Sequence, residues 1–329
     1  MVDQEYSASH RPADRDESMK GRVLDWLSTE GYPLEFATAT IFQQVGCRVF
    51  QSAYTRPPDG SPAREIDVIA QRFVDGSPSI AVQQIVECKH SVDKPWVFFV
   101  GSQGMSATAC AAQTIGSELG ETLLWREANN EQLVRLSLFS SPPGTTAFGG
   151  RQAFSGSRDV VYDTLRSVAS NTRTTMQEID ASMRYRARGL PSHALVGFPV
   201  VVVEGRLFIA GQDDRRGELK VAERDAVRLH WRGANDENPL VTIDVVTIEA
   251  LPAFAKQRAA DVAVLLGVMG TSLAELKDWV EAGADPAALR VTRGSRGVLG
   301  APKLVRRLAQ STVGGADGIA PEAASNEES

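Results

Sequence analysis

The stretches that decide the fold are Arg-Glu-Ile-Asp-Val-Ile at residues 64–69 and Ile-Val-Glu-Cys-Lys at residues 85–89. Both are rich in β-branched residues, and both predict strands. Side chains at positions i and i+2 of a strand share a face, while the residue between them points the other way. Glu87 and Lys89 are therefore expected to project together, with Cys88 turned into the core.

Turn signals separate these strands from each other and from their neighbours. Pro-Pro-Asp-Gly-Ser-Pro at residues 57–62 precedes the first strand, and Asp-Gly-Ser-Pro at residues 75–78 lies between the two. A further strand is predicted at residues 48–54, and apolar residues at helical spacing predict a helix at residues 33–45. The order helix, strand, strand, strand indicates an α/β fold.

The alternation of helices and strands continues along the chain, and no internal repeat interrupts it. Apolar spacing predicts further helices at residues 97–118, 159–180, 254–266, 273–280 and 301–309, the fourth opened by a capping box of Ser272 and Glu275. It predicts further strands at residues 133–139, 227–231 and 241–248, and a hairpin at residues 198–210 that turns at Glu204 and Gly205.

Four regions follow from composition and pattern. Residues 1–20 and the acidic tail at 311–329 contain too few apolar residues to offset the entropy of ordering, so both are expected to be disordered. Residues 21–251 are predicted to form the main domain. Residues 252–310 are predicted to form a small helical C-terminal annex, because the last predicted strand ends just before them.

Charge and cysteine content set limits on the class of protein. The formal net charge of −6 arises in the two tails, so the residues between them are neutral and neither imply nor exclude a polyanionic partner. The three cysteines have no metal-type spacing and are expected to be reduced. The longest apolar runs, such as residues 196–203, are shorter than the ~18 residues that span a bilayer. A cytoplasmic protein with no membrane segment is therefore expected.

The residues Asp67, Glu87 and Lys89 suit metal-assisted hydrolysis of phosphodiesters. If the two strands pair, two carboxylates and one ammonium group converge at one end of a sheet. Mg²⁺ prefers carboxylate and carbonyl oxygens, and a bound cation lowers the pKa of a coordinated water. A neighbouring lysine positions that water and stabilises negative charge on the phosphate.

The Glu-x-Lys pattern alone is weak, because it occurs three times in this chain. The pair Glu218 and Lys220 follows a polar turn, and Glu275 and Lys277 lie within a predicted helix, where positions i and i+2 do not face each other. Only Glu87 ends an apolar β-rich run that has an aspartate in a neighbouring strand.

At this point the chain resembles the PD-(D/E)xK nuclease superfamily, whose members have the restriction-endonuclease-like fold. The resemblance rests on Asp67, the spacing to Glu87-Cys88-Lys89, and a preceding helix with an acid near its start, Glu35. It covers roughly residues 31–110. Ile66 stands where the proline of the motif's name would be, and that position varies within the superfamily.

The resemblance implies a role for each matching residue. Asp67 and Glu87 would be metal ligands, with the Cys88 backbone carbonyl as a further ligand, Lys89 the catalytic lysine and Glu35 an auxiliary carboxylate. The implied cofactor is Mg²⁺ or Mn²⁺. The implied activity is hydrolysis of DNA phosphodiester bonds, in double-stranded DNA first of all, in host defence or DNA processing. A homodimer is also implied, since cutting two strands needs two sites, although no motif indicates one.

Several alternatives stay open at this stage. Asp67, Glu87 and Lys89 could be solvated or could pair with each other only as a surface salt bridge. Glu35 could lie in the first turn of its helix because the helix dipole favours an acid there, without any catalytic role. The chain could be a nucleic-acid-binding or regulatory module that does not cut, or a nuclease directed at RNA. Basic stretches at residues 184–188 and 290–307 could contact phosphates or could be solvated.

Overall fold

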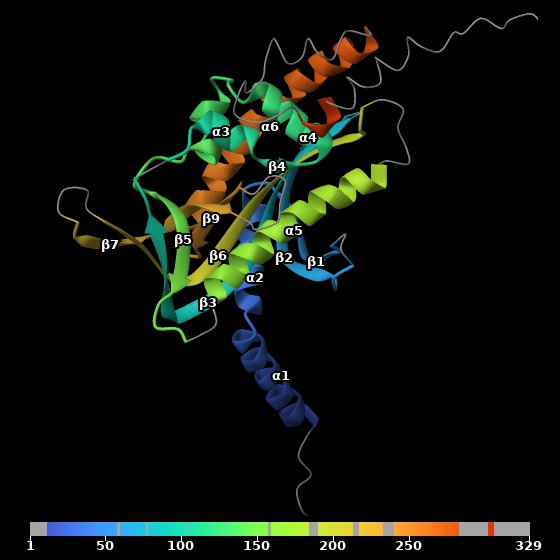
Figure 1. Ribbon diagram of the computed structural model, residues 1–329. Helices are drawn as coiled ribbons and strands as arrows, with labels where there is room; N and C mark the ends of the chain where they lie inside the picture. The colour runs from blue at the N-terminus through green and yellow to red at the C-terminus, as the bar shows by residue number, and fades with distance from the viewer. Residues whose placement is uncertain are drawn as a thin grey trace, which may run out of the picture.

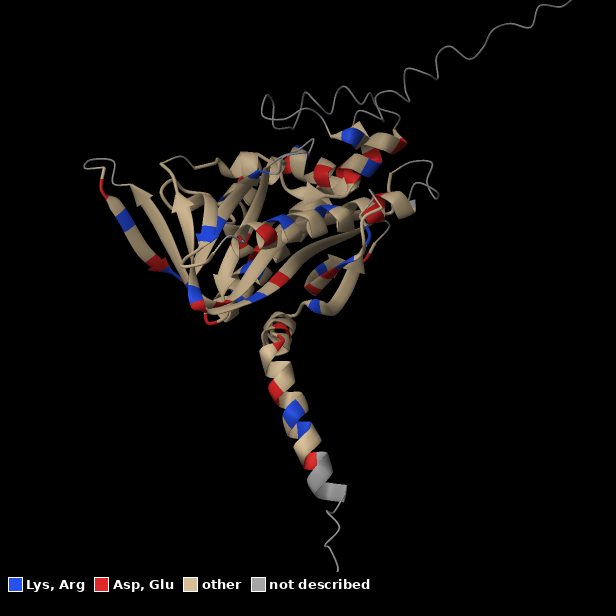
Figure 2. Cartoon of the chain, turned by 60° about the horizontal axis from the view of Figure 1, so that its bottom comes forward, with Lys and Arg blue, Asp and Glu red and all other residues tan. Residues whose placement is uncertain are grey.

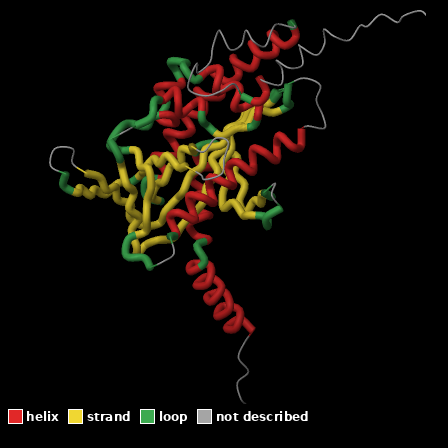
Figure 3. Tube along the Cα trace, viewed as in Figure 1, coloured by secondary structure: helices red, strands yellow, loops and turns green. Residues whose placement is uncertain are grey.

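A computed structural model describes residues 12–57, 60–76, 78–102, 104–156, 159–183, 190–212, 217–232, 240–282 and 302–305. The protein is an α/β protein with a mixed central sheet of nine strands, flanked by helices (Figures 1 and 3). The α-helices are α1 (Pro12–Thr29), α2 (Tyr32–Gln44), α3 (Ala107–Ala112), α4 (Glu118–Glu127), α5 (Val160–Met183) and α6 (Leu251–Glu281). The strands are β1 (Arg48–Thr55), β2 (Arg64–Val74), β3 (Ser79–Val100), β4 (Ile115–Gly116), β5 (Thr146–Gln152), β6 (His193–Gln212), β7 (Leu219–Arg224), β8 (Ala226–Arg232) and β9 (Leu240–Thr247).

The two longest strands, β3 and β6, run parallel to each other and form the spine of the sheet. The first half of β3 also pairs with β2, which pairs with β1, and both of these pairings are antiparallel. The second half of β3 pairs with β5 instead. Pairing then continues from β5 to β8, β9 and back to β6, so this half of the sheet curls into a closed ring.

Helices α2 and α6 cover one face of the sheet. Their apolar side chains pack against alternate residues of β2, β3, β6 and β9, as expected for a strand face with period 2. The buried residues of this cluster include Leu34, Phe42, Val68, Val86, Cys88, Val202 and Leu251. Helix α5 covers the opposite face. Its apolar residues, such as Leu165, pack there against strand residues of the curled half of the sheet, including Trp96, Phe98, Val201 and Val203.

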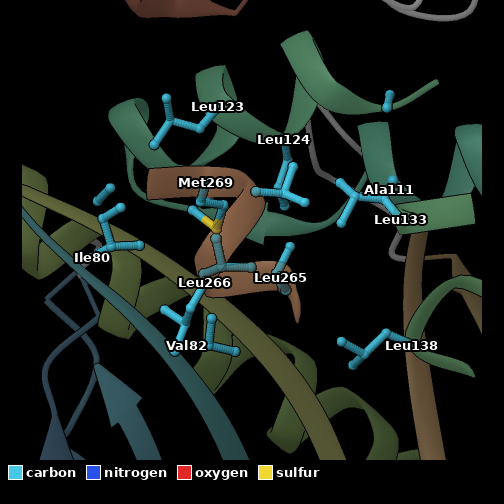
Figure 4. Close-up of a cluster of buried hydrophobic side chains, with 14 of the residues drawn as sticks. Ile80, Val82, Ala111, Leu123, Leu124, Leu133, Leu138, Leu265, Leu266 and Met269 are labelled. Carbon is cyan, nitrogen blue, oxygen red and sulfur yellow. The ribbon is translucent and has the colours of Figure 1, made fainter. Parts of the chain in front are cut away.

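A further core cluster lies where α3, α4 and α6 meet the beginning of β3 and β6 (Figure 4). Leu265, Leu266 and Met269 of α6 contact this cluster from one side, and Leu123 and Leu124 of α4 contact it from the other. Helix α6 therefore contributes to two core clusters of the main domain, which distinguishes it from a separate annex. The expected boundary at residue 252 coincides only with the start of this helix.

A buried ion network also joins α6 to the sheet. The Asp244 carboxylate of β9 accepts hydrogen bonds from Arg228 of β8 at 2.8 and 3.0 Å, and it contacts Arg258 of α6. Burial alone would raise the pKa of Asp244, but the two guanidinium groups outweigh burial and hold that pKa below its ordinary value.

Several predicted elements differ from the structure. The predicted helix at 97–118 is wrong over most of its length. Residues 97–100 continue β3, where Trp96 and Phe98 alternate as buried strand residues, and the rest of the range contains only the short helix α3 and the strand β4 before α4 begins at Glu118. Residues 133–139 form two 3₁₀ helices rather than a strand. The predicted helices at 254–266 and 273–280 are one helix, α6, so Ser272 lies in its interior and caps nothing.

The predicted hairpin at residues 198–210 is wrong, because β6 runs through Glu204 and Gly205 without turning. Gly205 is required by the packing of two strands rather than by a turn. A Cβ at this position would lie 2.5 Å from the Ser91 carbonyl oxygen of β3, so the close approach of the two strands requires glycine.

The ends of the chain differ in what the structure describes. Residues 12–20, predicted to be disordered, belong to α1, which stands away from the body of the protein with charges of both signs along it (Figure 2). Residues 1–11 and 311–329 lie outside the described residues, as do the basic stretch at 184–188 and most of the one at 290–307. The three cysteines are free thiols, as the sequence predicts.

Helix α6 is long and apolar enough, by length and composition alone, to cross a membrane. Half of its most apolar window is buried inside the fold. A core helix of a soluble protein passes the same test, so this feature is weak evidence for a membrane segment.

Candidate active site

The candidate site lies where β2 and β3 separate. Their antiparallel ladder runs from the turn as far as the pair Val68 and Val86, and it stops one residue before Asp67 and Glu87. Beyond that pair, β2 continues beside β1 only, while β3 continues beside β6. We call this point the strand fork. Past this point β2 and β3 form no ladder pairs with each other, so the backbone groups on their facing edges have no ladder partner there.

Asp67 bridges the strand fork with its side chain. Its Oδ2 atom accepts a hydrogen bond of 2.7 Å from the backbone N–H of Cys88. On the other side of β2, the ladder with β1 is regular except at Asp67, because the pair that it would form with Ser52 is missing. Ser52 has a φ of 48°, in the left-handed region that residues other than glycine rarely adopt. Backbone strain of this kind is concentrated at functional sites.

Glu87 and Lys89 project together from β3, as the sequence predicts. The Lys89 Nζ atom lies 2.7 Å from the Glu87 Oε1 atom, and their side chains are 32% and 12% exposed. Cys88 points to the other face, where its Sγ atom lies 3.7 Å from the hydroxyl of Thr38 on α2. Burial raises the pKa of the Cys88 thiol, so this thiol is no nucleophile at neutral pH.

Glu35 lies in the first turn of α2, three residues before Thr38 and therefore on the same side of the helix. Burial raises the pKa of Glu35, and so do the charges of Glu65 and Glu87, while Lys89 lowers it. Glu35 thus acts on the cluster through its charge, whereas Asp67, Glu87 and Lys89 are held by direct contacts.

The electrostatics of the cluster are those of carboxylates crowded into a partly buried space. Burial, with the Glu87 charge second, raises the pKa of Asp67 to about 7, although the Cys88 N–H and Lys89 both act to lower it. Burial lowers the pKa of Lys89, but the contact with Glu87 outweighs burial and leaves that pKa above its ordinary value. The cluster therefore holds excess negative charge that a bound cation would relieve.

The donor atoms fit a hard divalent cation. Mg²⁺ usually takes one or two carboxylates and keeps several waters, and Asp67 and Glu87 supply two. In an extended strand the N–H and C=O of one residue point to the same edge, so the Cys88 carbonyl faces the same edge of β3 as the N–H that binds Asp67. Within the described residues, no group of three His, Cys, Asp or Glu side chains could hold a metal ion unaided. Any such site here would therefore need the backbone and water as ligands.

Two residues of this site were not identified from the sequence. Ser52 carries no motif, and its left-handed backbone cannot be read from a strand pattern. Thr38 could have been found, since it follows Glu35 by one helical turn in a helix predicted to pack on the sheet.

The other candidate groups lie elsewhere. The second Glu-x-Lys pair is on the surface, with Lys220 on β7, and the third lies within α6, where Glu275 contacts Arg126. His90 adjoins the site in sequence, but its Nδ1 atom makes an exposed 2.8 Å contact with the Glu204 Oε2 atom of β6. None of these three groups adds a ligand at the strand fork.

The structure therefore defines an α/β protein with a carboxylate and lysine cluster at a strand fork of its central sheet. Comparison with protein-family models, curated proteins and solved structures gave no match for this chain.

Proposed function

We propose that this protein is a metal-dependent nuclease of the PD-(D/E)xK type, with a restriction-endonuclease-like core formed by α2, β1, β2, β3 and β6. The observation that carries the proposal is the convergence of Asp67, Glu87 and Lys89 at the strand fork. Three groups from two strands meet there through a backbone hydrogen bond and an ion pair. A surface salt bridge alone would not account for the bridging Asp67 or for the interrupted ladder beside it.

The proposed roles follow from the contacts. Asp67 and Glu87, with the Cys88 carbonyl, would hold Mg²⁺ or Mn²⁺, and the bound cation would polarise the scissile phosphate and activate a water. The ion pair with Glu87 holds the Lys89 ammonium group in place, so that it can orient the attacking water and donate to a phosphate oxygen. Glu35 adds negative charge near the cation from α2.

Duplex DNA is the proposed substrate, and its cleavage is the test of the proposal. Purified protein would be incubated with duplex DNA, single-stranded DNA and RNA of one sequence, each with Mg²⁺, Mn²⁺ or chelator. We expect metal-dependent cleavage of the duplex. Cleavage of RNA alone would replace DNA by RNA as the substrate, and the absence of cleavage on all three substrates with both metals would overturn the nuclease assignment.

A further inference from the structure

Helix α1 carries apolar side chains that the fold leaves uncovered. The helix stands away from the body of the protein, and residues 17–29 are all exposed or half-buried (Figure 1). Met19, Val23, Leu24 and Trp26 are each between 45% and 55% exposed. Among the described residues, none of α1 belongs to a core cluster. Helices gain most of their stability by packing an apolar face, so α1 lacks the partner that such a face requires.

The apolar side chains of α1 share one side of the helix. Val23 and Trp26 follow Met19 by four and seven residues, which places all three in one row. Leu24 and Leu27 lie beside this row, one helical turn apart. We call these five residues the apolar stripe. Contiguous exposed apolar surface of this kind marks an interaction site.

Two charged residues adjoin the apolar stripe, one at each end. Lys20 precedes Leu24 by one helical turn. Glu30 follows Trp26 by one turn, and its backbone N–H donates to the Trp26 carbonyl at 3.1 Å, so it continues the helical path. The two charges lie about 15 Å apart along the helix, and therefore they do not contact each other.

The charges of this segment disfavour two other kinds of partner. Residues 17–30 contain three acids, Glu17, Asp25 and Glu30, and two bases, Lys20 and Arg22. Helices that bind anionic lipid surfaces and segments that bind nucleic acid carry an excess of Lys and Arg. The apolar stripe instead suits a partner that offers one negative and one positive end.

We propose that two copies of this chain pair through α1, side by side and antiparallel. This direction sets Lys20 of each copy beside Glu30 of the other, whereas the parallel direction would set like charges together. Between these ends the two apolar stripes face each other, with Val23 of each copy opposite Leu27 of the other. The arrangement is two-fold symmetric, as in most homodimers. It goes beyond the nuclease proposal and does not depend on it, because assembly is measured without metal or nucleic acid.

Sedimentation velocity of the full chain, over a range of micromolar concentrations, measures this assembly. The helix pair is short, so the interface lies at the small end of specific interfaces, and we expect a reversible equilibrium between single chains and dimers. Val23→Ala combined with Leu24→Ala should abolish the dimer while keeping the helix, because alanine is the best helix former. An unchanged thermal midpoint of this variant checks that the body of the protein is folded.

Charge reversals test the direction of pairing. Lys20→Glu and Glu30→Lys should each weaken the dimer by roughly tenfold or more, because two ion pairs become two pairs of like charges. A mixture of these two variants should assemble as wild type does, since each chain then meets the opposite charge in the other. Asp25→Lys is the matched control. It reverses a charge on the opposite side of α1 and should assemble as wild type does.

The outcomes that would overturn the proposal are distinct. They are a wild type that stays monomeric, a dimer that the double alanine variant does not weaken, single charge variants that assemble as wild type does, and single variants that do not recover on mixing. An effect of Asp25→Lys equal to that of Glu30→Lys would also contradict the pairing. Monomeric wild type that cosediments with vesicles of phosphatidylcholine and phosphatidylglycerol would overturn the proposal and assign the apolar stripe to a lipid surface.

Discussion

The backbone N–H of Cys88 donates a 2.7 Å hydrogen bond to the Asp67 carboxylate, just beyond the last ladder pair of β2 and β3, Val68 and Val86. The side chain thus takes the place that a backbone carbonyl would take if the ladder continued. This contact brings the aspartate of one strand to the Glu-x-Lys segment of the next. The proposed activity depends on that juxtaposition, and so does the first prediction.

Asp67→Asn should strongly reduce cleavage without unfolding the protein. The amide oxygen of the new side chain can still accept from the Cys88 N–H, and a partly buried carboxylate is removed, so the thermal midpoint should not fall. A cation would lose one of its two carboxylate ligands. We expect cleavage to fall by a factor on the order of 10²–10³, measured by initial rates beside a melting curve. Cleavage within a few-fold of wild type would show that Asp67 has no catalytic role.

Ser52→Gly should stabilise the protein. The left-handed backbone of Ser52, with φ of 48°, is unfavourable for a residue with a Cβ, and the side chain is exposed, so no packing is lost. The gain should be roughly 0.5–1 kcal/mol, since the greater flexibility of glycine in the unfolded state offsets part of the relief. Urea unfolding measures this change. Ser52→Val should be less stable than wild type, and the opposite order would contradict the backbone geometry described here.

Asp244→Asn should destabilise the protein strongly. The substitution removes the one carboxylate that the buried guanidinium groups of Arg228 and Arg258 both contact, and leaves them only the more distant charge of Asp261. We expect a loss of about 3–5 kcal/mol in the free energy of unfolding. Glu223→Gln, which breaks the exposed pair with Arg206, is the matched control and should leave the unfolding midpoint almost unchanged. Equal effects of the two variants would argue against integration of α6 into the core.

Glu121→Gln should remove a pH dependence of stability. Burial, with a contribution from the Asp180 charge, raises the pKa of Glu121 to about 7 from its ordinary value near 4.5. Between these two values the unfolded chain ionises and the folded chain does not, so stability falls as pH rises and is lowest above about 7. The variant should therefore be more stable than wild type at pH 8, by about 3 kcal/mol at most, and equal to it at pH 4. Glu131→Gln, an exposed site on the surface, should keep the wild-type profile.

The strands around the site were predictable from sequence, because their apolar runs end at strong turn signals. The strand predicted at residues 48–54 matches β1 closely, and the strand predicted around residues 64–69 lies within β2. Alternation alone predicted that Glu87 and Lys89 project together and that Cys88 turns to the other face. That the strand of Asp67 pairs with this strand was a condition of the prediction, and the structure pairs β2 with β3.

Elements that are determined by tertiary contacts could not be predicted from the local sequence in the same way. Gly205 resembles a turn residue, but it is required where β6 approaches β3. Leu133 and Phe139 lie in the two 3₁₀ helices and Leu136 lies between them; the three are spaced by three and all buried, which suits 3₁₀ turns rather than a strand. The continuation of β3 past Lys89 depends on β5 and β6, which are far away in the sequence.

The most direct test of the central claim is cleavage of supercoiled plasmid by wild type, Lys89→Ala and Lys220→Ala, prepared in parallel. The two variants remove the lysine of a Glu-x-Lys pair at the strand fork and on the surface of β7, respectively. The account predicts metal-dependent nicking or linearisation by wild type and Lys220→Ala, and its loss in Lys89→Ala and with chelator. Undiminished cleavage by Lys89→Ala would contradict the account, because the activity would then come from another site or a contaminant.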